Sequence, residues 1–399
     1  MPISYLSITT PDPAQVLWQL QQPAAVTILL ILLGLTFPLR GVILLIVGGG
    51  RGLRPSRTSI VVCVIETLLG VGILCLARVS VLGLYLLLAA YLFAILAAKG
   101  IDCYLYARAR QWRYFIPSAA ATWLGSQFLL VLLTTPPFFK RQILLLFSLL
   151  MLAVIGASTL CDLLFYLVRS CRFRRVLNNI RFALPDYVGL MLPLHMTDAA
   201  APEPLAPAQT GDVEVLFQVS RRGIGIVGHC ELCIDGRTLT YGCYEPESRR
   251  FFRSMGGGVI FRAPREAYLR WAMQANHKKI VSYTLRLPPE QMARVRRQLA
   301  RLGSQVTPWT PQESPQEFIM RVRQLPGVQV YRVHSGPFRT YFVPTINCVS
   351  ITSSILSRTE LGGAIMPGIK TPGAYMDLLD RQFYSGSSVV VAKHVYGEA

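Results

Sequence analysis

The first 170 residues contain five long runs of apolar residues, and this feature restricts the fold more than any other. The runs lie at about 24–49, 59–78, 80–98, 115–135 and 143–168. A helix needs about 20 consecutive apolar residues to cross a lipid bilayer. The whole chain is 52% hydrophobic and 15% charged, with a mean hydropathy of +0.42, which is too apolar for an ordinary soluble protein. We therefore predict an α-helical transmembrane bundle of about five helices in residues 1–185.

Positive charge is concentrated beside these apolar runs. Residues 1–185 carry 16 Lys and Arg against 4 Asp and Glu, a net charge of +12, whereas residues 186–399 carry 24 against 17, a net charge of +7. With five spans, 12 loop cations fall on one side of the bilayer and 3 on the other. Lys and Arg accumulate in cytoplasmic loops, so we predict a multi-pass protein of the cell (inner) membrane whose C-terminal half is cytoplasmic. The charge then has a lipid bilayer as its partner, and we expect no nucleic acid.

Two features leave alternatives open in this half of the chain. The first apolar run contains Pro38 and Arg40, so it is either one kinked span or a broken hairpin. The second possibility moves only the N-terminus across the bilayer. Glu66 and Asp162 lie within predicted spans, where buried carboxylates can mark a transport path. They support an alternative class of function, a transporter or pore-forming toxin, against the simpler interpretation that each faces a neighbouring helix.

An Ala- and Pro-rich linker at 186–212 precedes a second domain at 213–399, in which the apolar pattern changes. The pattern and the turn residues predict strands at 213–219, 223–234, 237–244, 258–262, 280–287, 328–334 and 339–343. They predict helices at 264–276, 288–302 and 315–323, and another that begins at Cys348. The Gly- and Pro-rich tail from Gly362 is expected to wrap the surface. These elements make a mixed α+β domain that is large enough for its own core.

Cys348 is the first candidate for a chemical role. Asn347 occupies the position of a helix N-cap, so Cys348 falls in the first helical turn. A thiol there meets unsatisfied backbone N–H groups and the positive end of the helix dipole. Both favour the thiolate, the form of cysteine that attacks carbonyl groups.

His229 is the candidate general base for this thiol. It lies within a predicted strand, directly after Gly228, which leaves room beside the ring. The alternative is a histidine that is satisfied within the core or on the surface.

The order of these residues resembles a known group of domains. The segment 228–236, followed by Tyr241 and Gly242, is similar to the histidine strand of circularly permuted papain-like domains, and 346–350 is similar to their cysteine helix. The resemblance includes the Lnb-type (lacto-N-biosidase N-terminal-like) domains, the lecithin retinol acyltransferase-like proteins and other relatives of the NlpC peptidases. The strand, turn and helix from Thr284 to Val295 also resemble the Lnb-type group. The similar part covers about residues 213–360.

The resemblance implies a permuted papain-like fold in which Cys348 is the nucleophile and His229 its base. Backbone N–H groups at the start of the Cys348 helix would hold the oxyanion. A third polar group normally orients the imidazole, and Tyr241 and Glu245 are the candidates for that role. Residues 347–351 lack the Asn-Cys-Glu-His-Phe run of the retinol acyltransferase group, which leaves the substrate open.

Other motifs in the domain carry less weight. Cys230 and Cys233 match a CxxC pattern, but side chains three positions apart on a strand point to opposite faces, so we expect structural thiols and no metal. The glycine turn predicted at 256–258 lacks a following Lys-Ser or Lys-Thr pair, so it is no P-loop and no cofactor is expected.

The sequence therefore predicts a membrane-anchored thiol hydrolase, either a peptidase or an amidase, or an acyltransferase. Its substrate would be a lipid, lipoprotein or peptide near the membrane, attacked at an amide, ester or thioester. A non-catalytic membrane scaffold that binds a partner is the main alternative. The relatives of the Lnb-type group act outside the cytoplasm, so a periplasmic domain is the alternative to the cytoplasmic location.

Overall fold

The structure is a computed structural model, and it describes about half of the chain. The described ranges are 81–108, 110–134, 203–205, 211–219, 228–274, 279–312, 317–359, 361, 371–384 and 389–397, with single positions between 28 and 71 and between 156 and 176. Most of the apolar runs at 24–49, 59–78 and 143–168 lie outside these residues, as do Glu66 and Asp162.

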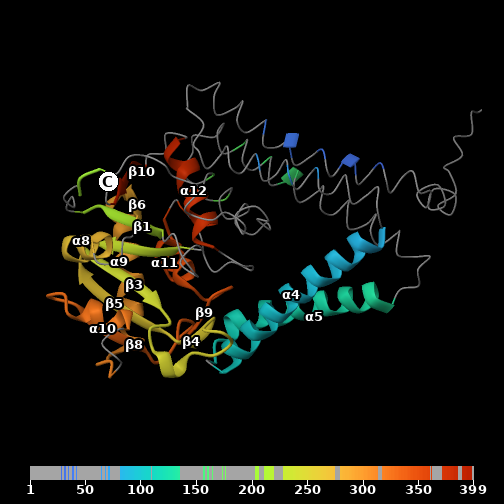
Figure 1. Ribbon diagram of the computed structural model, residues 1–399, viewed down its shortest axis with the longest axis horizontal. Helices are drawn as coiled ribbons and strands as arrows, with labels where there is room; N and C mark the ends of the chain where they lie inside the picture. The colour runs from blue at the N-terminus through green and yellow to red at the C-terminus, as the bar shows by residue number, and fades with distance from the viewer. Residues whose placement is uncertain are drawn as a thin grey trace, which may run out of the picture.

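An eight-stranded sheet organises the α+β domain, and all of its strand pairings are antiparallel. Figure 1 shows the sheet with helices on both sides. Across the sheet, the strands are β10 (Val390–Tyr396), β6 (Lys279–Leu285), β1 (Val213–Val219), β2 (His229–Ile234), β3 (Arg237–Gly242), β5 (Val259–Pro264), β8 (Gln329–Val333) and β7 (Val306–Pro308).

Two hydrophobic cores fill the two faces of this sheet, because side chains alternate along each strand. One face packs against α9 (Pro289–Gly303), α11 (Cys348–Leu356) and α12 (Pro372–Tyr384). The other packs against α8 (Arg265–Gln274) and α10 (Phe318–Arg323). We call these the α11 face and the α8 face.

Several predicted elements are confirmed. The β2–β3 hairpin turns at Asp235 and Gly236, whose φ angles are 50° and 71°. This is the left-handed pair that a two-residue hairpin turn requires. The predicted helix starts beside Pro264 and Pro288 correspond to α8 and α9.

Two expectations for the domain were wrong. The tail after Gly362 does not simply wrap the surface: it supplies α12 and the edge strand β10, which pairs with β6. The β-branched run at 389–391 is typical of a strand. Gly256 and Gly257 form no turn, because they belong to β4 (Met255–Gly257), which pairs with β9 (Thr340–Phe342). A side chain at Gly256 would collide with the sulfur of Cys243, so this close approach requires glycine.

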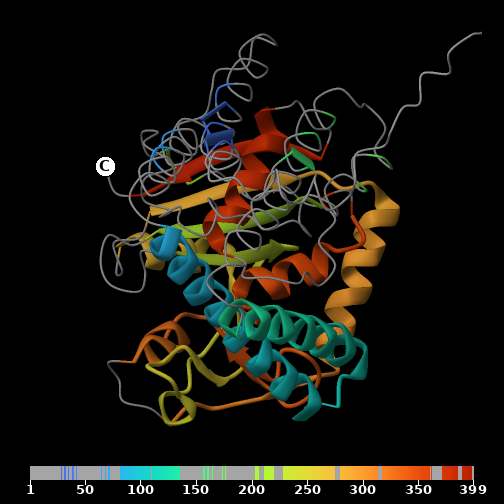
Figure 2. The ribbon, with the colours of Figure 1, turned by 90° about the vertical axis from the view of Figure 1, so that its right-hand side faces the viewer.

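Two antiparallel helices are described within the predicted membrane region, residues 1–185. They are α4 (Val81–Arg108) and α5 (Trp112–Thr134), and we call them the helical hairpin. Its closed end packs against the α11 face through Leu105 and Tyr106, and Figure 2 shows both helices lying in front of the domain. Within the described ranges, one segment, Tyr114–Thr134, is long and apolar enough to cross a membrane. A transmembrane bundle therefore stays a prediction.

The hairpin differs from the prediction at one boundary. The third apolar run was expected to end near residue 98, so that Lys99 would lie among the cytoplasmic loop cations. Instead α4 continues to Arg108, and Lys99 is buried within it beside Asp102. An ion pair explains how a lysine is tolerated at this position.

Candidate active site

The start of α11 has the predicted local structure. Asn347 is the N-cap, and its side-chain oxygen accepts hydrogen bonds from the N–H groups of Val349 (3.0 Å) and Ser350 (3.1 Å). The Ser350 hydroxyl closes the reciprocal half of a capping box. Asn347 also donates to the carbonyl of Val343 at 2.7 Å. Cys348 is therefore the first residue of a firmly capped helix.

The Cys348 sulfur faces strand β2. It accepts a hydrogen bond from the backbone N–H of Cys230 at 3.4 Å. Cys230 directly follows His229, so the fold brings the predicted nucleophile to the strand end that carries the predicted base. The Cys348 side chain belongs to the hydrophobic core of the α11 face, and the residue is 3% exposed.

The expected thiolate is not the resting form of this cysteine. Burial raises the pKa of Cys348 to about 11, although the backbone N–H groups of Cys230 and Val349 act in the opposite direction. The helix start lowers the pKa as predicted, but the loss of solvent outweighs it. At neutral pH the sulfur is therefore a thiol that needs a base.

His229 lies at the first position of β2, after Gly228 with a left-handed φ of 78°. Its Nε2 atom is 3.3 Å from the hydroxyl of Tyr244 and 3.9 Å from a carboxylate oxygen of Glu231. Glu231 is two residues further along the strand, and side chains at that spacing share a face. The imidazole is thus oriented by a phenol and a carboxylate on the α8 face, whereas the Cys348 sulfur lies on the opposite, α11 face of β2.

Glu231 is the centre of a buried polar network on the α8 face. Its carboxylate accepts hydrogen bonds from Tyr268 (2.6 Å), Thr240 (2.9 Å) and Gln218 (2.9 Å). The side chain is fully buried, and a buried carboxylate is tolerated only with donors of this kind. Three donors to both oxygens hold Glu231 in place beside His229.

Tyr244 lies on the α8 face, where its ring packs against Phe261 and Phe318. Burial raises its pKa well above the ordinary value, and Glu231 and Cys348 raise it further. Its hydroxyl therefore lies within electrostatic reach of the carboxylate and the thiol, in addition to its contact with His229. A protonated phenol at this position can donate to, or accept from, the imidazole.

The two residues predicted to orient the imidazole are engaged elsewhere. The Tyr241 hydroxyl donates to the carbonyl of Phe338 at 3.0 Å, in the core of the α11 face. Glu245 forms an ion pair with Arg332. Glu231 could have been found from the sequence, since period two places it on the face of His229. Tyr244 follows the end of β3, so strand periodicity gave no signal for it.

The two thiols of the CxxC pattern point to opposite faces, as predicted. Cys230 belongs to the core of the α11 face and Cys233 to that of the α8 face. Among the described residues, no group of three or more His, Cys, Asp or Glu side chains is arranged to hold a metal ion.

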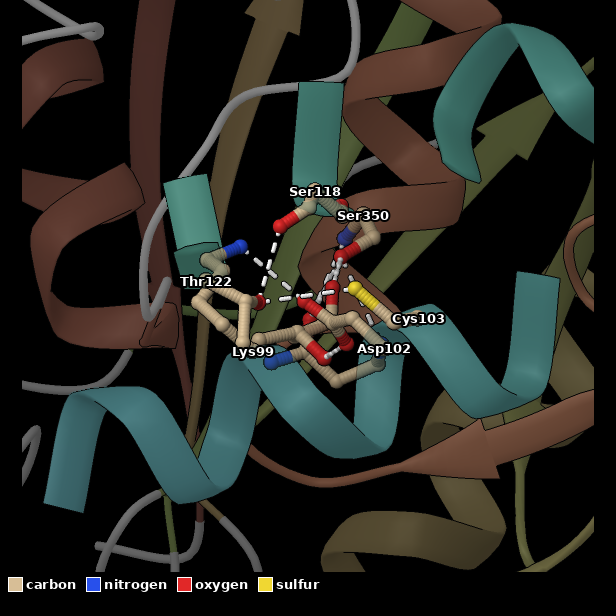
Figure 3. Close-up of polar contacts among 8 residues, drawn as sticks. Lys99, Asp102, Cys103, Ser118, Thr122 and Ser350 are labelled. Atoms are coloured by element: carbon tan, nitrogen blue, oxygen red, sulfur yellow. Dashed lines mark hydrogen bonds and ion pairs between the residues drawn. The ribbon is translucent and has the colours of Figure 1, made fainter. Parts of the chain in front are cut away.

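The helical hairpin contributes one polar contact to the turn before Cys348. Asp102 in α4 accepts a hydrogen bond from the hydroxyl of Thr345 and an ion pair from Lys99 at 2.9 Å. Figure 3 shows Lys99 and Asp102 next to Ser350 at the start of α11. The sequence gave no indication of this contact, because it joins residues 243 positions apart.

Comparisons of the whole chain with protein-family models, with curated proteins and with solved structures found no match.

Proposed function

We propose that this protein is a membrane-anchored thiol enzyme, a hydrolase or an acyltransferase, that works through Cys348 and His229. One observation carries the proposal. The sulfur at a capped helix start lies 3.4 Å from the N–H of the residue that follows His229, whose ring is in turn oriented by Glu231 and Tyr244. A nucleophile, a base and groups that orient the base are the components of a thiol active site.

The reaction would begin with proton transfer, because the thiol is protonated at rest. His229 is the first residue of β2, and its ring would turn past the end of the strand to take the proton of Cys348 as the sulfur forms a bond to the carbonyl carbon of an amide, ester or thioester. The imidazolium then gives this proton to the departing amine, alcohol or thiol as its bond to the acyl group breaks. Water completes hydrolysis of the acyl-enzyme, whereas a second amine or alcohol completes transfer.

The negative charge near the imidazole suits this sequence of steps. An imidazolium formed beside the buried Glu231 carboxylate is stabilised by opposite charge, with 3.9 Å between the two atoms. Asn347 occupies the N–H groups of Val349 and Ser350. The N–H groups of Cys230, Val349 and Cys348 all act on the sulfur, and those of Cys230 and Cys348 are not used by the cap, so they would be the donors to an oxyanion formed there.

The apolar first half suggests where the substrate lies. A multi-pass inner-membrane protein would hold the domain close to a bilayer, which favours a lipid, lipoprotein or membrane-near peptide as substrate. The loop cations favour a cytoplasmic domain, with the periplasm as the alternative. A reporter fused through a linker after residue 399 distinguishes the two.

The test compares single substitutions in the full-length protein. Cys348→Ala and His229→Ala should each abolish the in vivo phenotype and the labelling by an electrophilic acyl probe, whereas Cys243→Ala should leave both unchanged. If Cys348→Ala and His229→Ala both behave like the parent protein, the proposal is wrong.

The burial of Cys348 favours a second candidate, a non-catalytic scaffold that binds a partner. A thiol that is 3% exposed and has a pKa of about 11 is protected as well as positioned. This candidate predicts that iodoacetamide labels Cys348 no faster than Cys230 or Cys243. Selective labelling of Cys348 would exclude it.

A further inference from the structure

The buried Asp102 carboxylate in α4 accepts a hydrogen bond from Thr345, in the turn before α11. The local fold of this turn does not require that bond. Asp102 is 1% exposed, and both of its oxygens are in use, one by Lys99 and one by Thr345. Removing a carboxylate from water is energetically costly. An apolar residue would pack the closed end of the hairpin without that cost, so the contact with Thr345 calls for a separate explanation.

Thr345 belongs to the turn that leads into Cys348. Its backbone carbonyl accepts the Ser350 hydroxyl at 2.5 Å, and the same hydroxyl lies 3.3 Å from the cap oxygen of Asn347. A continuous chain of hydrogen bonds therefore runs from Asp102 through Thr345 and Ser350 to Asn347.

The turn is complete without Asp102. The N–H groups of Thr345 and Ile346 both donate to the carbonyl of Phe342, at 3.1 and 2.9 Å. Asn347 and Ser350 complete the cap among themselves. The bond to Asp102 adds nothing that the turn lacks locally, but it fixes the turn to a helix from the apolar half of the chain.

We infer that Asp102 is a positioning residue, which holds the Cys348 helix start in register with the helical hairpin through Thr345. A displacement of α4 then moves the turn and changes the access of solvent or substrate to the sulfur. The hairpin, which contains the apolar Tyr114–Thr134 segment, becomes a route by which the state of the membrane half reaches the thiol. The catalytic meaning rests on the proposed function, whereas the physical coupling does not.

The experiment measures how fast iodoacetamide modifies Cys348 and Cys230 in the full-length protein in lipid nanodiscs, with each site resolved by mass spectrometry. Because both thiols are buried, their rates report local opening. Thr345→Val removes the hydroxyl at nearly constant shape and should raise the Cys348 rate about tenfold, the effect of losing a hydrogen bond to a charged group. Asp102→Ala removes the acceptor and should do the same, and the double variant should equal either single variant. The Cys230 rate should stay at the parent value.

Two further variants keep the test specific. Thr345→Ser retains the hydroxyl and should restore the parent rate. Thr122→Val removes a hydroxyl that bonds only within the hairpin, to the Ser118 carbonyl and near Cys103, and should change nothing. If Thr345→Val matches Thr122→Val, or if Cys230 accelerates in parallel with Cys348, the inference is overturned. If only the proposed function is wrong, Cys348→Ala keeps full activity, while the Thr345 and Asp102 variants still change the labelling rate of Cys348 as described.

Discussion

The two faces of strand β2 carry different chemistry within one short segment. On the α11 face, Cys230 and Leu232 pack with Cys348 in an apolar core, and the thiol is kept neutral by burial. On the α8 face, the buried Glu231 carboxyl accepts hydrogen bonds from three donors. The same loss of solvent therefore favours the neutral form on one face and is compensated on the other. A buried group keeps its charge only where the fold supplies partners.

The largest expected effect comes from removing the charge on the polar face. Glu231→Ala leaves the hydroxyl donors of Tyr268 and Thr240 without their acceptor and leaves Gln218 bonded to Tyr268 alone, which should cost about 3–5 kcal/mol of unfolding free energy. Denaturation in urea measures it. The matched substitution on the apolar face, Cys230→Ala, should cost far less. Equal losses of stability in the two variants would show that the Glu231 network contributes no more than the apolar packing of Cys230.

The next effect tests the neutral thiol through pH. The pKa of Cys348 in the folded protein is about 11, above the ordinary cysteine value of 9.0. The folded state therefore holds the proton more tightly, and the stability that this contributes is complete below pH 9 and is lost as the pH rises towards 11. Between those limits the parent protein should lose about 2 kcal/mol more than Cys348→Ala. Parallel pH curves for the two proteins would mean that the thiol is not desolvated.

Tyr268→Phe should have a similar or slightly smaller effect. It removes one donor from the Glu231 carboxylate, a bond of 2.6 Å to a charged acceptor, and should cost about 2 kcal/mol. Because Glu231 helps to orient His229, the pH dependence of any Cys348 chemistry should shift as well. Stability and a pH–rate profile, measured on the same variant, separate the two consequences.

The smallest expected effect comes from substitutions that change apolar packing on each face and leave the polar network intact. Cys230→Ala and Cys233→Ala delete one buried sulfur from each face, and each should cost about 1 kcal/mol in packing. Similar values would confirm that the faces differ in their charged partners rather than in their packing. A difference above about 2 kcal/mol between the two variants would contradict this.

Features that depend on neighbouring residues could be predicted from the sequence. The Asp235–Gly236 turn, the cap at Asn347 and the proline-led start of α9 follow from local chemistry. The proximity of Cys348 to His229 came from a resemblance, and the structure brings Cys348 to the residue next to His229. Period two on β2 was sufficient to find Glu231, although the prediction chose Tyr241 and Glu245 instead.

Contacts between distant segments could not be predicted in this way. Thr345 and Asp102 belong to different halves of the chain, and their bond depends on how the hairpin packs against the domain. Burial of the Cys348 sulfur has the same origin, since a helix start says nothing about what covers it. The thiol pKa was therefore predicted in the wrong direction.

The position of β10 has a consequence for synthesis of the protein. β10 covers the edge of β6, but its last residue, Tyr396, follows the end of β6 by more than a hundred positions. At about 5–20 residues per second, a ribosome needs on the order of 10 s to bridge that interval. During this time β6 has one unpaired edge. An unpaired strand edge is a template for association with another chain, so the nascent domain has a defined interval in which a chaperone or a nearby bilayer would protect it.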